Sequence, residues 1–197
     1  MTQTALYPLT IYLCRHAETI WTLSGQHTGH SDIPLTDKGR EQALTLQYRL
    51  ESIPFHHIMT SPLQRAKESC EITFPGKPIV EDVDLMEWDY GDYEGMTSTS
   101  IRQKNPSWNL FHDGAPNGES PAHAAARADR ILKKLHDKQG NIAIFSHGHF
   151  SRVLAARWLN LSIEHAANFF LSVCSVSILG FEHQRPVIRL WNDIGHL

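Results

Sequence analysis

Two histidines each follow a short apolar run, at the point where a strand is expected to end. His16 comes after Arg15 and the run 9–14, and His147 comes directly after the run 141–146. If these strands are neighbours in a mostly parallel sheet, their carboxyl ends open onto one crevice, which is where open α/β sheets bind ligands. Two imidazoles and a guanidinium in one crevice suit a phosphoryl group. The sequence therefore predicts a phosphate site at this edge of the sheet.

These residues also have a plain structural interpretation, as do two candidates elsewhere in the chain. A single histidine after a strand is more often a hydrogen-bonded structural residue than a catalyst. Arg65 could pair with Glu68 on its own helix, a surface contact of small energy. Glu87 could be one more charge in an acidic segment. The matching positions of His16 and His147 favour the functional interpretation.

Alternating strands and helices are expected to position these residues. Apolar runs predict strands over 9–14, 55–60, 79–83, 141–146, 173–181 and 187–191. Helical spacing and capping residues predict helices over 36–50, 61–74, 119–138 and 150–159, the second opened by Ser61 as N-cap and Pro62. Glycines and polar residues predict irregular structure over 22–34. This order predicts an α/β fold, a three-layer α/β/α sandwich with a mostly parallel, Rossmann-like sheet and one antiparallel edge strand.

Length and composition are those of one ordinary domain, residues 1–197. A net charge of −3 lacks the basic excess of a dedicated nucleic-acid binder. The apolar stretch 169–181 is interrupted by serines and is shorter than the roughly 20 residues of a membrane helix. The first ten residues show no secretion signal. The three cysteines are scattered along the chain, which predicts buried thiols rather than disulfides. We therefore expect a cytoplasmic protein without nucleic-acid or membrane partners.

Four segments at predicted strand ends occur in an order that resembles the histidine phosphatase superfamily, which includes the cofactor-dependent phosphoglycerate mutases. They are 15–19 (Arg-His-Ala-Glu-Thr), 61–66, Glu87 with the following Tyr-Gly pair, and 146–149 (Ser-His-Gly-His). The resemblance covers nearly the whole chain and implies a phosphohistidine intermediate with no metal or other cofactor. By matching position it implies a nucleophile, a proton donor and a three-residue phosphate pocket, which are His16, Glu87, and the set Arg15, Arg65 and His147.

The residue types suit this chemistry independently. Phosphoryl transfer needs an in-line nucleophile, neutralisation of charge on the equatorial oxygens and protonation of the leaving alkoxide. A neutral histidine offers a lone pair near pH 7, since its reference pKa is about 6.5, and guanidiniums bind phosphate oxygens in forked geometry. Glu87 must be protonated to donate, which burial or the neighbouring Trp88 would favour. His147, if protonated, would donate to a third oxygen, and Gly148 would let the backbone approach closely.

The loop after the first predicted strand indicates a substrate class. Residues 24–29 (Ser-Gly-Gln-His-Thr-Gly) resemble a loop of the sedoheptulose-bisphosphatase branch, where the Thr-Gly pair lines the substrate site. The resemblance implies that Thr28 and Gly29 contact substrate, together with Thr22, Tyr90 and Gly148. The alternative is a surface loop whose polar groups satisfy their own backbone. We expect a small phosphorylated metabolite as partner, with sugar phosphates as the best class, and leave the oligomeric state open.

Three other functions are weighed against hydrolysis. A mutase needs extra cations to hold a bisphosphate, but Ser98 stands where the family's mutases carry lysine, and the stretch 102–118 lacks their arginine pair. A metal site at His147 and His149 would rest on alternate residues facing one side of a strand, and it needs a further ligand. A phosphate-binding regulatory module would keep the pocket without turnover. The intact His16 and Glu87 favour an enzyme, and we predict a phosphatase.

Overall fold

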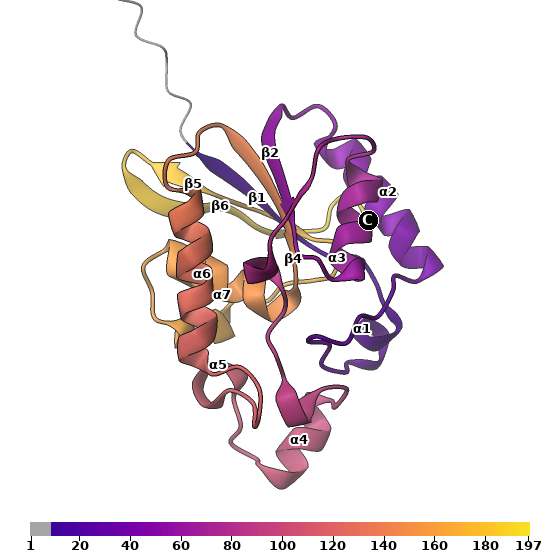
Figure 1. The fold of residues 1–197 in the computed structure, drawn as a ribbon, viewed down its shortest axis with the longest axis vertical. Coiled ribbons are helices and arrows are strands. Elements are labelled where there is room, and N and C mark those ends of the chain that lie inside the picture. The colour runs from indigo at the N-terminus through magenta and orange to yellow at the C-terminus, as the bar shows by residue number, and fades with distance from the viewer. Residues whose placement is uncertain (1–8) are drawn as a thin grey trace, which may run out of the picture.

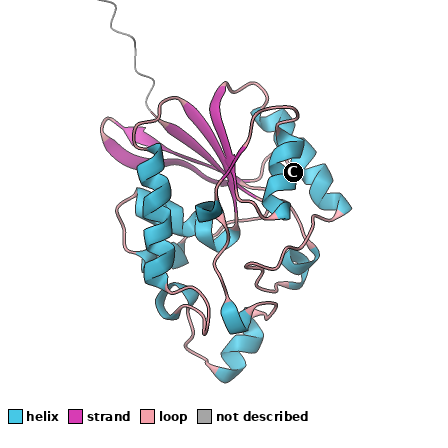
Figure 2. Cartoon of the chain, viewed as in Figure 1, coloured by secondary structure: helices cyan, strands magenta, loops and turns pink. Residues whose placement is uncertain are grey.

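A six-stranded sheet forms the middle layer of the chain, of which the computed structural model describes residues 9–197 (Figure 1). The strands are β1 (Thr10–Arg15), β2 (Phe55–Thr60), β3 (Val80–Glu81), β4 (Asn141–Ser146), β5 (Val176–Glu182) and β6 (Arg185–Asp193). Their order across the sheet is β3-β2-β4-β1-β5-β6. Helices lie on both faces of the sheet (Figure 2), which confirms the three-layer α/β fold.

The sheet is mostly parallel, as expected. β1 to β4 run in one direction, and β5 pairs antiparallel with both β1 and β6. The predicted antiparallel pairing of the last two strands is thus confirmed. The antiparallel strand is not at the edge of the sheet, however, because β6 pairs with the outer side of β5 and is itself the edge strand. β1 and β4 are neighbours, with Arg15 opposite Ser146. His16 and His147 therefore leave the sheet side by side.

Two apolar cores explain the continuous apolar runs of the central strands. Ile11 and Leu13 of β1 pack with the face covered by α6 (Pro121–Leu135) and α7 (Gly148–Trp158). Tyr12 and Cys14 pack with the opposite face, covered by α2 (Asp37–Leu50) and α3 (Gln64–Thr73). Strands that are buried on both faces need apolar residues at every position. The three cysteines are free and buried, as predicted.

Two helices begin directly after the residue whose side chain caps them. Thr36 caps α2, because its hydroxyl accepts a hydrogen bond from the N–H of Gly39 at 2.9 Å. Ser120 caps α6 in the same way, so the helix begins at Pro121, two residues later than expected, and ends at Leu135. The other helices are short: α1 (Ile20–Ser24), α4 (Ser98–Lys104) and α5 (Leu110–Asp113).

Several predicted boundaries are wrong. Ser61 does not cap α3, which begins at Gln64, because the Ser61 hydroxyl binds His147 and Leu63 keeps an extended backbone. α1 lies partly inside the segment expected to be irregular, since a capping box between Thr19 and Thr22 starts it. The strand expected over 79–83 is only two residues long and runs into a 3-10 helix, Val83–Leu85. β5 starts three residues late, after Cys174 takes a left-handed conformation with φ of 53°.

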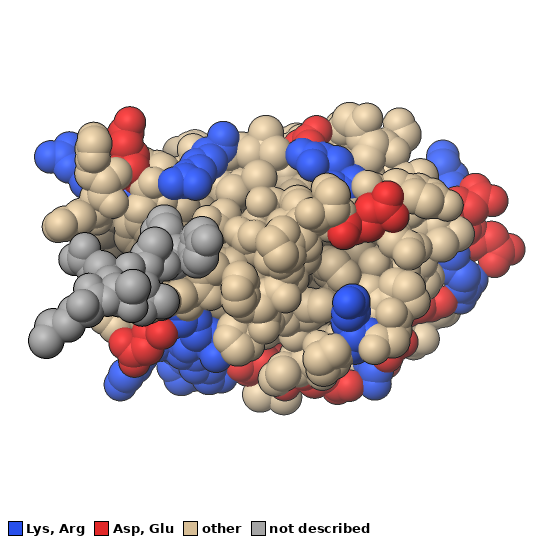
Figure 3. All heavy atoms as spheres, turned by 90° about the horizontal axis from the view of Figure 1, so that it is seen from above, with Lys and Arg blue, Asp and Glu red and all other residues tan. Residues whose placement is uncertain are grey.

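Acidic and basic side chains are interspersed over the face shown in Figure 3, in keeping with the small net charge. Among residues 9–197, no helix has the length and apolar character needed to cross a membrane. The segment 1–8, over which we expect no secretion signal, lies outside the described residues.

Candidate active site

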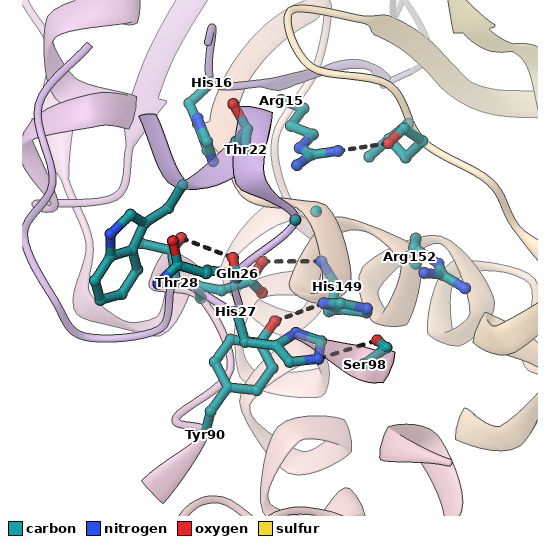
Figure 4. A pocket seen from close by; sticks show the side chains of 15 residues that line it. Arg15, His16, Thr22, Gln26, His27, Thr28, Tyr90, Ser98, His149 and Arg152 are labelled. Carbon is teal, nitrogen blue, oxygen red and sulfur yellow. Dashed lines mark hydrogen bonds between the residues drawn. The ribbon is translucent and has the colours of Figure 1, made fainter. Parts of the chain in front are cut away.

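A cavity of about 240 Å³ lies at the carboxyl ends of β1 and β4 (Figure 4). Its wall contains seven of the ten predicted site residues: Arg15, His16, Thr22, Thr28, Glu87, Tyr90 and Gly148. The other three, Gly29, Arg65 and His147, are buried and do not line this cavity. The fold therefore brings the predicted residues together in one region, with seven of them on the cavity wall and three buried outside it.

His16 is held as a neutral ring with its lone pair on one nitrogen. Its Nδ1 lies 2.8 Å from the carbonyl oxygen of Ala17. Because a carbonyl oxygen only accepts hydrogen bonds, Nδ1 carries the hydrogen and Nε2 keeps its lone pair. Burial lowers the pKa of His16 well below 6.5, and the nearby Arg65 and Arg15 lower it further. A nucleophilic nitrogen is thus available at neutral pH.

His147 is fully buried beside His16, with ring centroids 5.2 Å apart. Its Nε2 lies 2.8 Å from the Ser61 hydroxyl, and its Nδ1 has no hydrogen-bond partner among residues 9–197. Burial, followed by the charge of Arg65, lowers the pKa of His147 well below 6.5. His147 is therefore neutral in the ligand-free protein, rather than protonated. It can donate from Nδ1 only in the tautomer that carries the hydrogen there.

Arg15 crosses the start of α7 at Gly148. Its Nη1 donates to the carbonyl oxygen of Leu171 at 2.6 Å, and its Nε is buried without a partner among residues 9–197. A Cβ on Gly148 would lie only 3.2 Å from Cζ of Arg15. The glycine therefore leaves room for this guanidinium. Burial lowers the pKa of Arg15, while the charge of Glu87 opposes that effect.

Arg65 lies in the first turn of α3, as predicted, and is fully buried. Its two terminal nitrogens donate to the carbonyl oxygens of residues 28, 29 and 31, at 3.0, 2.8 and 3.0 Å. Glu68 pairs instead with Arg40 at 2.6 Å, so the alternative of a surface pair for Arg65 is wrong. The Nε of Arg65 has no partner among the described residues. Arg65 thus fastens the first loop to the site, and its Nε–H stays available.

Glu87 lines the cavity and caps α7 from outside the helix. Oε1 accepts hydrogen bonds from the N–H groups of Trp88 and Phe150, at 2.9 and 2.8 Å, and Oε2 accepts one from His149 at 3.0 Å. The side chain is 4% exposed. The Trp88 ring packs edge-on against Phe111, and its Nε1 donates to the carbonyl oxygen of Glu119. With one bond on Oε2, that oxygen has a second lone pair that can carry a proton.

Two threonines of the first loop, Thr22 and Thr28, line the cavity. Thr22 lines the wall, and its hydroxyl completes the capping box with Thr19. The Thr28 hydroxyl donates to the carbonyl oxygen of Gln26 at 3.2 Å. The N–H of Gly29 donates to Glu94, and a Cβ there would lie 2.5 Å from a backbone oxygen. Gly29 therefore has a packing role in the structure and lies outside the cavity wall.

A layer of neutral polar rings covers the far wall, and sequence reasoning did not select most of it. The Tyr90 hydroxyl lies 2.5 Å from Nδ1 of His149, and Ser98 lies 3.2 Å from Nε2 of His27 (Figure 4). Burial lowers the pKa of His27 to about 4 and that of His149 well below 6.5, and it raises that of Tyr90. Tyr90 and His149 are therefore both neutral, and one hydrogen bond joins the phenol hydroxyl to Nδ1 of the ring.

Arg152 is a cation of the cavity wall that the sequence analysis missed. It lies on α7, donates to the carbonyl oxygens of residues 166 and 167, and has its guanidinium 4.6 Å from the centroid of the Phe111 ring. Burial lowers the pKa of Arg152 to about 10. Its position three residues after His149, about one helical turn further along α7, is the only local signal that could have indicated it.

The argument for a metal at His147 and His149 loses its basis. Those residues do not alternate on a strand, because α7 begins between them at Gly148. Their ring nitrogens have different partners, Ser61 for His147 and Tyr90 for His149.

Comparison with known proteins places the chain in a family. The model of the histidine phosphatase superfamily (branch 1) matches residues 11–194. An acid phosphatase from Mycobacterium tuberculosis is 36% identical over 191 residues, covering 94% of this chain and 93% of the relative. Sedoheptulose 1,7-bisphosphatase from Saccharomyces cerevisiae is 33% identical, covering 77% and 68% of the two chains. A 2,3-bisphosphoglycerate-dependent phosphoglycerate mutase from Gloeobacter violaceus is 28% identical, covering 88% and 85%.

Solved structures agree with the sequence comparison. The product of an open reading frame of Mycobacterium tuberculosis superposes with a TM-score of 0.89 at 33% identity, covering 93% of this chain and 96% of that one. A phosphoserine phosphatase from Entamoeba histolytica, solved with 3-phosphoglyceric acid, gives 0.83 at 26% identity, with 96% and 99% covered. Both the sequence and the fold are therefore shared over almost the full length. The chain belongs to branch 1 of the histidine phosphatase superfamily, and it is a phosphatase.

Proposed function

We propose that this phosphatase hydrolyses small sugar phosphates through a phosphohistidine on His16, without a metal ion. One observation carries the proposal. Next to the neutral His16 lie three buried nitrogens that have no partner among residues 9–197: Nε of Arg15, Nε of Arg65 and Nδ1 of His147. Buried polar groups are rarely left unpaired, and the oxygens of a phosphoryl group would pair with them.

In the first step, the lone pair on Nε2 of His16 attacks phosphorus. The P–N bond forms while the bond from phosphorus to the ester oxygen breaks, and Glu87 gives its proton to the leaving alkoxide. The guanidiniums of Arg15 and Arg65 neutralise charge on the phosphoryl oxygens.

In the second step, water replaces the alcohol. The Glu87 carboxylate takes a proton from the attacking water, the new P–O bond forms and the P–N bond breaks. The electron pair of that bond returns to Nε2 of His16, and inorganic phosphate leaves. The same carboxyl group thus serves as acid and then as base, so no second titratable group is required.

Sugar phosphates suit the far wall of the cavity. Gln26, Thr28, Ser98 and the neutral His27 offer hydrogen bonds without a fixed charge, and sugar hydroxyls both donate and accept. The similarity to a sedoheptulose 1,7-bisphosphatase supports the same class. Release of inorganic phosphate from a panel of phosphorylated metabolites tests it, with phosphoserine and nucleotides as the comparison. If phosphoserine or a nucleotide were hydrolysed faster than every sugar phosphate tested, sugar phosphates would be rejected as the substrate class.

The intermediate can be trapped directly. Labelled substrate should leave an acid-labile, alkali-stable phosphate on the wild-type enzyme, and a chelator should not change the rate. His16→Ala should lose the label and fall by several orders of magnitude in turnover, because water in the pocket does not replace the nucleophile. His123→Gln, at an exposed histidine on α6, is the matched control. Undiminished hydrolysis by His16→Ala would overturn the mechanism.

Phosphoglycerate mutase activity is the second candidate, because Arg152 adds a cation to the wall. Ser98 and the missing arginine pair still argue for water as the acceptor, since a bisphosphate is held by charge. With 3-phosphoglycerate and catalytic 2,3-bisphosphoglycerate, 2-phosphoglycerate should form more slowly than phosphate is released from the preferred sugar phosphate. Mutase turnover above every hydrolytic rate measured on the same preparation would promote the alternative.

A further inference from the structure

Glu87 lies in a segment that has neither helix nor strand. The 3-10 helix Val83–Leu85 ends before it, and residues 87–90 have no regular hydrogen bonding. Its carboxylate is oriented by N–H groups of Trp88, His149 and Phe150, but those bonds need the peptide backbone of Glu87 to stay at a fixed distance from α7. Something outside the segment must hold that backbone.

Arg127, on the buried face of α6, makes those contacts. Its Nη1 donates to the carbonyl oxygens of Asp84 and Met86, at 3.0 and 2.5 Å, and its Nη2 donates to that of Glu87 at 3.3 Å. Three carbonyls over four residues thus converge on one guanidinium. No hydrogen bond within the segment could replace them in this conformation without moving the chain.

The guanidinium is itself held on its other edge. Nε and Nη2 donate to the two carboxylate oxygens of Glu119, at 2.9 and 2.6 Å. The side chains of this pair are only 10% and 13% exposed. Together with the three carbonyls, these bonds occupy all five N–H donors that a guanidinium has.

Arg127 also contacts α7 directly. Its Cζ lies 4.0 Å from the centroid of the Phe150 ring, and the N–H of Phe150 binds Oε1 of Glu87. A single side chain therefore joins α6, the segment that carries Glu87, and the helix turn that orients the carboxylate. A lysine has one nitrogen and no planar fork, so it cannot make these contacts together.

We infer that Arg127, held by Glu119, is a positioning residue that sets the place of Glu87 for proton transfer. Arg127 does not line the cavity, and it acts through the backbone of Glu87. The inference rests on the proposed role of Glu87 as proton donor. A carboxyl group displaced by a few tenths of an ångström donates poorly, because proton transfer needs hydrogen-bond geometry with the leaving oxygen.

The test separates positioning from a merely structural role by the leaving group. Arg127→Lys should slow phosphoenzyme formation from an alkyl phosphate by roughly 10- to 100-fold, the range of general acid catalysis at its lower end. It should slow the same step with p-nitrophenyl phosphate less than about 3-fold, since that leaving group needs little protonation. Glu119→Gln, which keeps the shape but removes the charge, should show the same selectivity more weakly. Rapid-quench measurement on enzyme with a native far-ultraviolet spectrum isolates this step.

Two further variants make the outcome unambiguous. Arg157→Lys changes another arginine–carboxylate pair, the one that joins α7 to Asp129 of α6, and it should leave both rates unchanged. Arg127→Lys added to Glu87→Gln should cost little more than Glu87→Gln alone, because residues that act through one another are not additive. Equal losses of Arg127→Lys on both substrates, or full additivity with Glu87→Gln, would overturn the inference. If Glu87→Gln itself shows no dependence on the leaving group, the proton-donor assignment fails instead.

Discussion

At the scale of single residues, the site depends on histidines that burial keeps neutral. His16 has its Nδ1 hydrogen on the Ala17 carbonyl and two guanidiniums nearby, so protonation would bury a third positive charge beside them. A free histidine in water would be partly protonated below pH 6.5, and it would then have no lone pair for phosphorus. The cationic surroundings that bind phosphate therefore also keep the nucleophile active.

This predicts the titration of His16 in the ligand-free enzyme. Because its pKa lies well below 6.5, the ring should stay neutral, with hydrogen on Nδ1, as the pH falls through 6.5. Ring ¹⁵N shifts, assigned with His16→Gln, measure both the charge and the tautomer. The limb of kcat/KM that belongs to His16 should accordingly lie below pH 6.5, once the ionisation of the substrate is taken into account. A midpoint at or above 6.5 for these shifts would contradict the tautomer and the burial argument together.

At the scale of elements, the turn from β4 into α7 is the centre of the site. It supplies His147, Gly148 and the N–H groups that bind Glu87, all within four residues. A helix start presents unpaired N–H groups, so a carboxylate is well placed there. Arg15, from the neighbouring β1, crosses the same turn where only a glycine leaves space.

Gly148→Ala should therefore harm activity without harming stability. The new Cβ would lie 3.2 Å from Cζ of Arg15, so the guanidinium must shift by a few tenths of an ångström. We expect kcat/KM to fall about 10-fold, since small misplacements of a phosphate-binding group weaken the transition state. The free energy of unfolding should stay the same or rise by less than about 1 kcal/mol, because alanine suits a helix better than glycine. Urea unfolding and steady-state kinetics on the same sample decide it. Unchanged kcat/KM would show that Arg15 does not need its present position.

At the scale of the whole molecule, the buried histidines link stability to pH. His16, His27, His147 and His149 all have pKa values below 6.5 in the folded protein, and burial is the first cause for each. In the unfolded chain they titrate near 6.5. A depressed folded pKa gives stability that is present above the unfolded value and is lost as the pH falls toward the folded value. The protein should therefore lose stability below pH 6.5.

His27 gives the testable share of this loss. Its pKa falls from 6.5 to about 4, which corresponds to about 3 kcal/mol lost by pH 4 at roughly 1.4 kcal/mol per unit. In His27→Gln, the free energy of unfolding should decline less steeply between pH 6.5 and 4.5 than in the wild type. His123→Gln, at an exposed position, is the control and should keep the wild-type slope. Parallel curves for His27→Gln and the wild type would refute the assignment.

Local signals in the sequence determined much of the framework. Apolar runs marked β1, β2 and β4, and the polar residue after each run marked the edge where a ligand would bind. Thr36 marked the start of α2, and the spacing after β2 placed Arg65 in a first helical turn. These features depend on residues only a few positions apart, so periodicity and capping chemistry are enough to find them. The residue type alone indicated His16 as the nucleophile, because few side chains can attack phosphorus.

The tertiary structure alone decided how the parts meet. Arg65 turns toward the carbonyls of the first loop, 34 to 37 residues away, and Arg127 reaches a segment about 40 residues away. Ser61 leaves the helix it was expected to cap, because a histidine 86 residues further along competes for its hydroxyl. Which nitrogen of His149 carries the hydrogen depends on its contact with Tyr90, 59 residues earlier in the chain. No local pattern encodes such contacts, since they exist only after both cores have packed the helices against the two faces of the sheet.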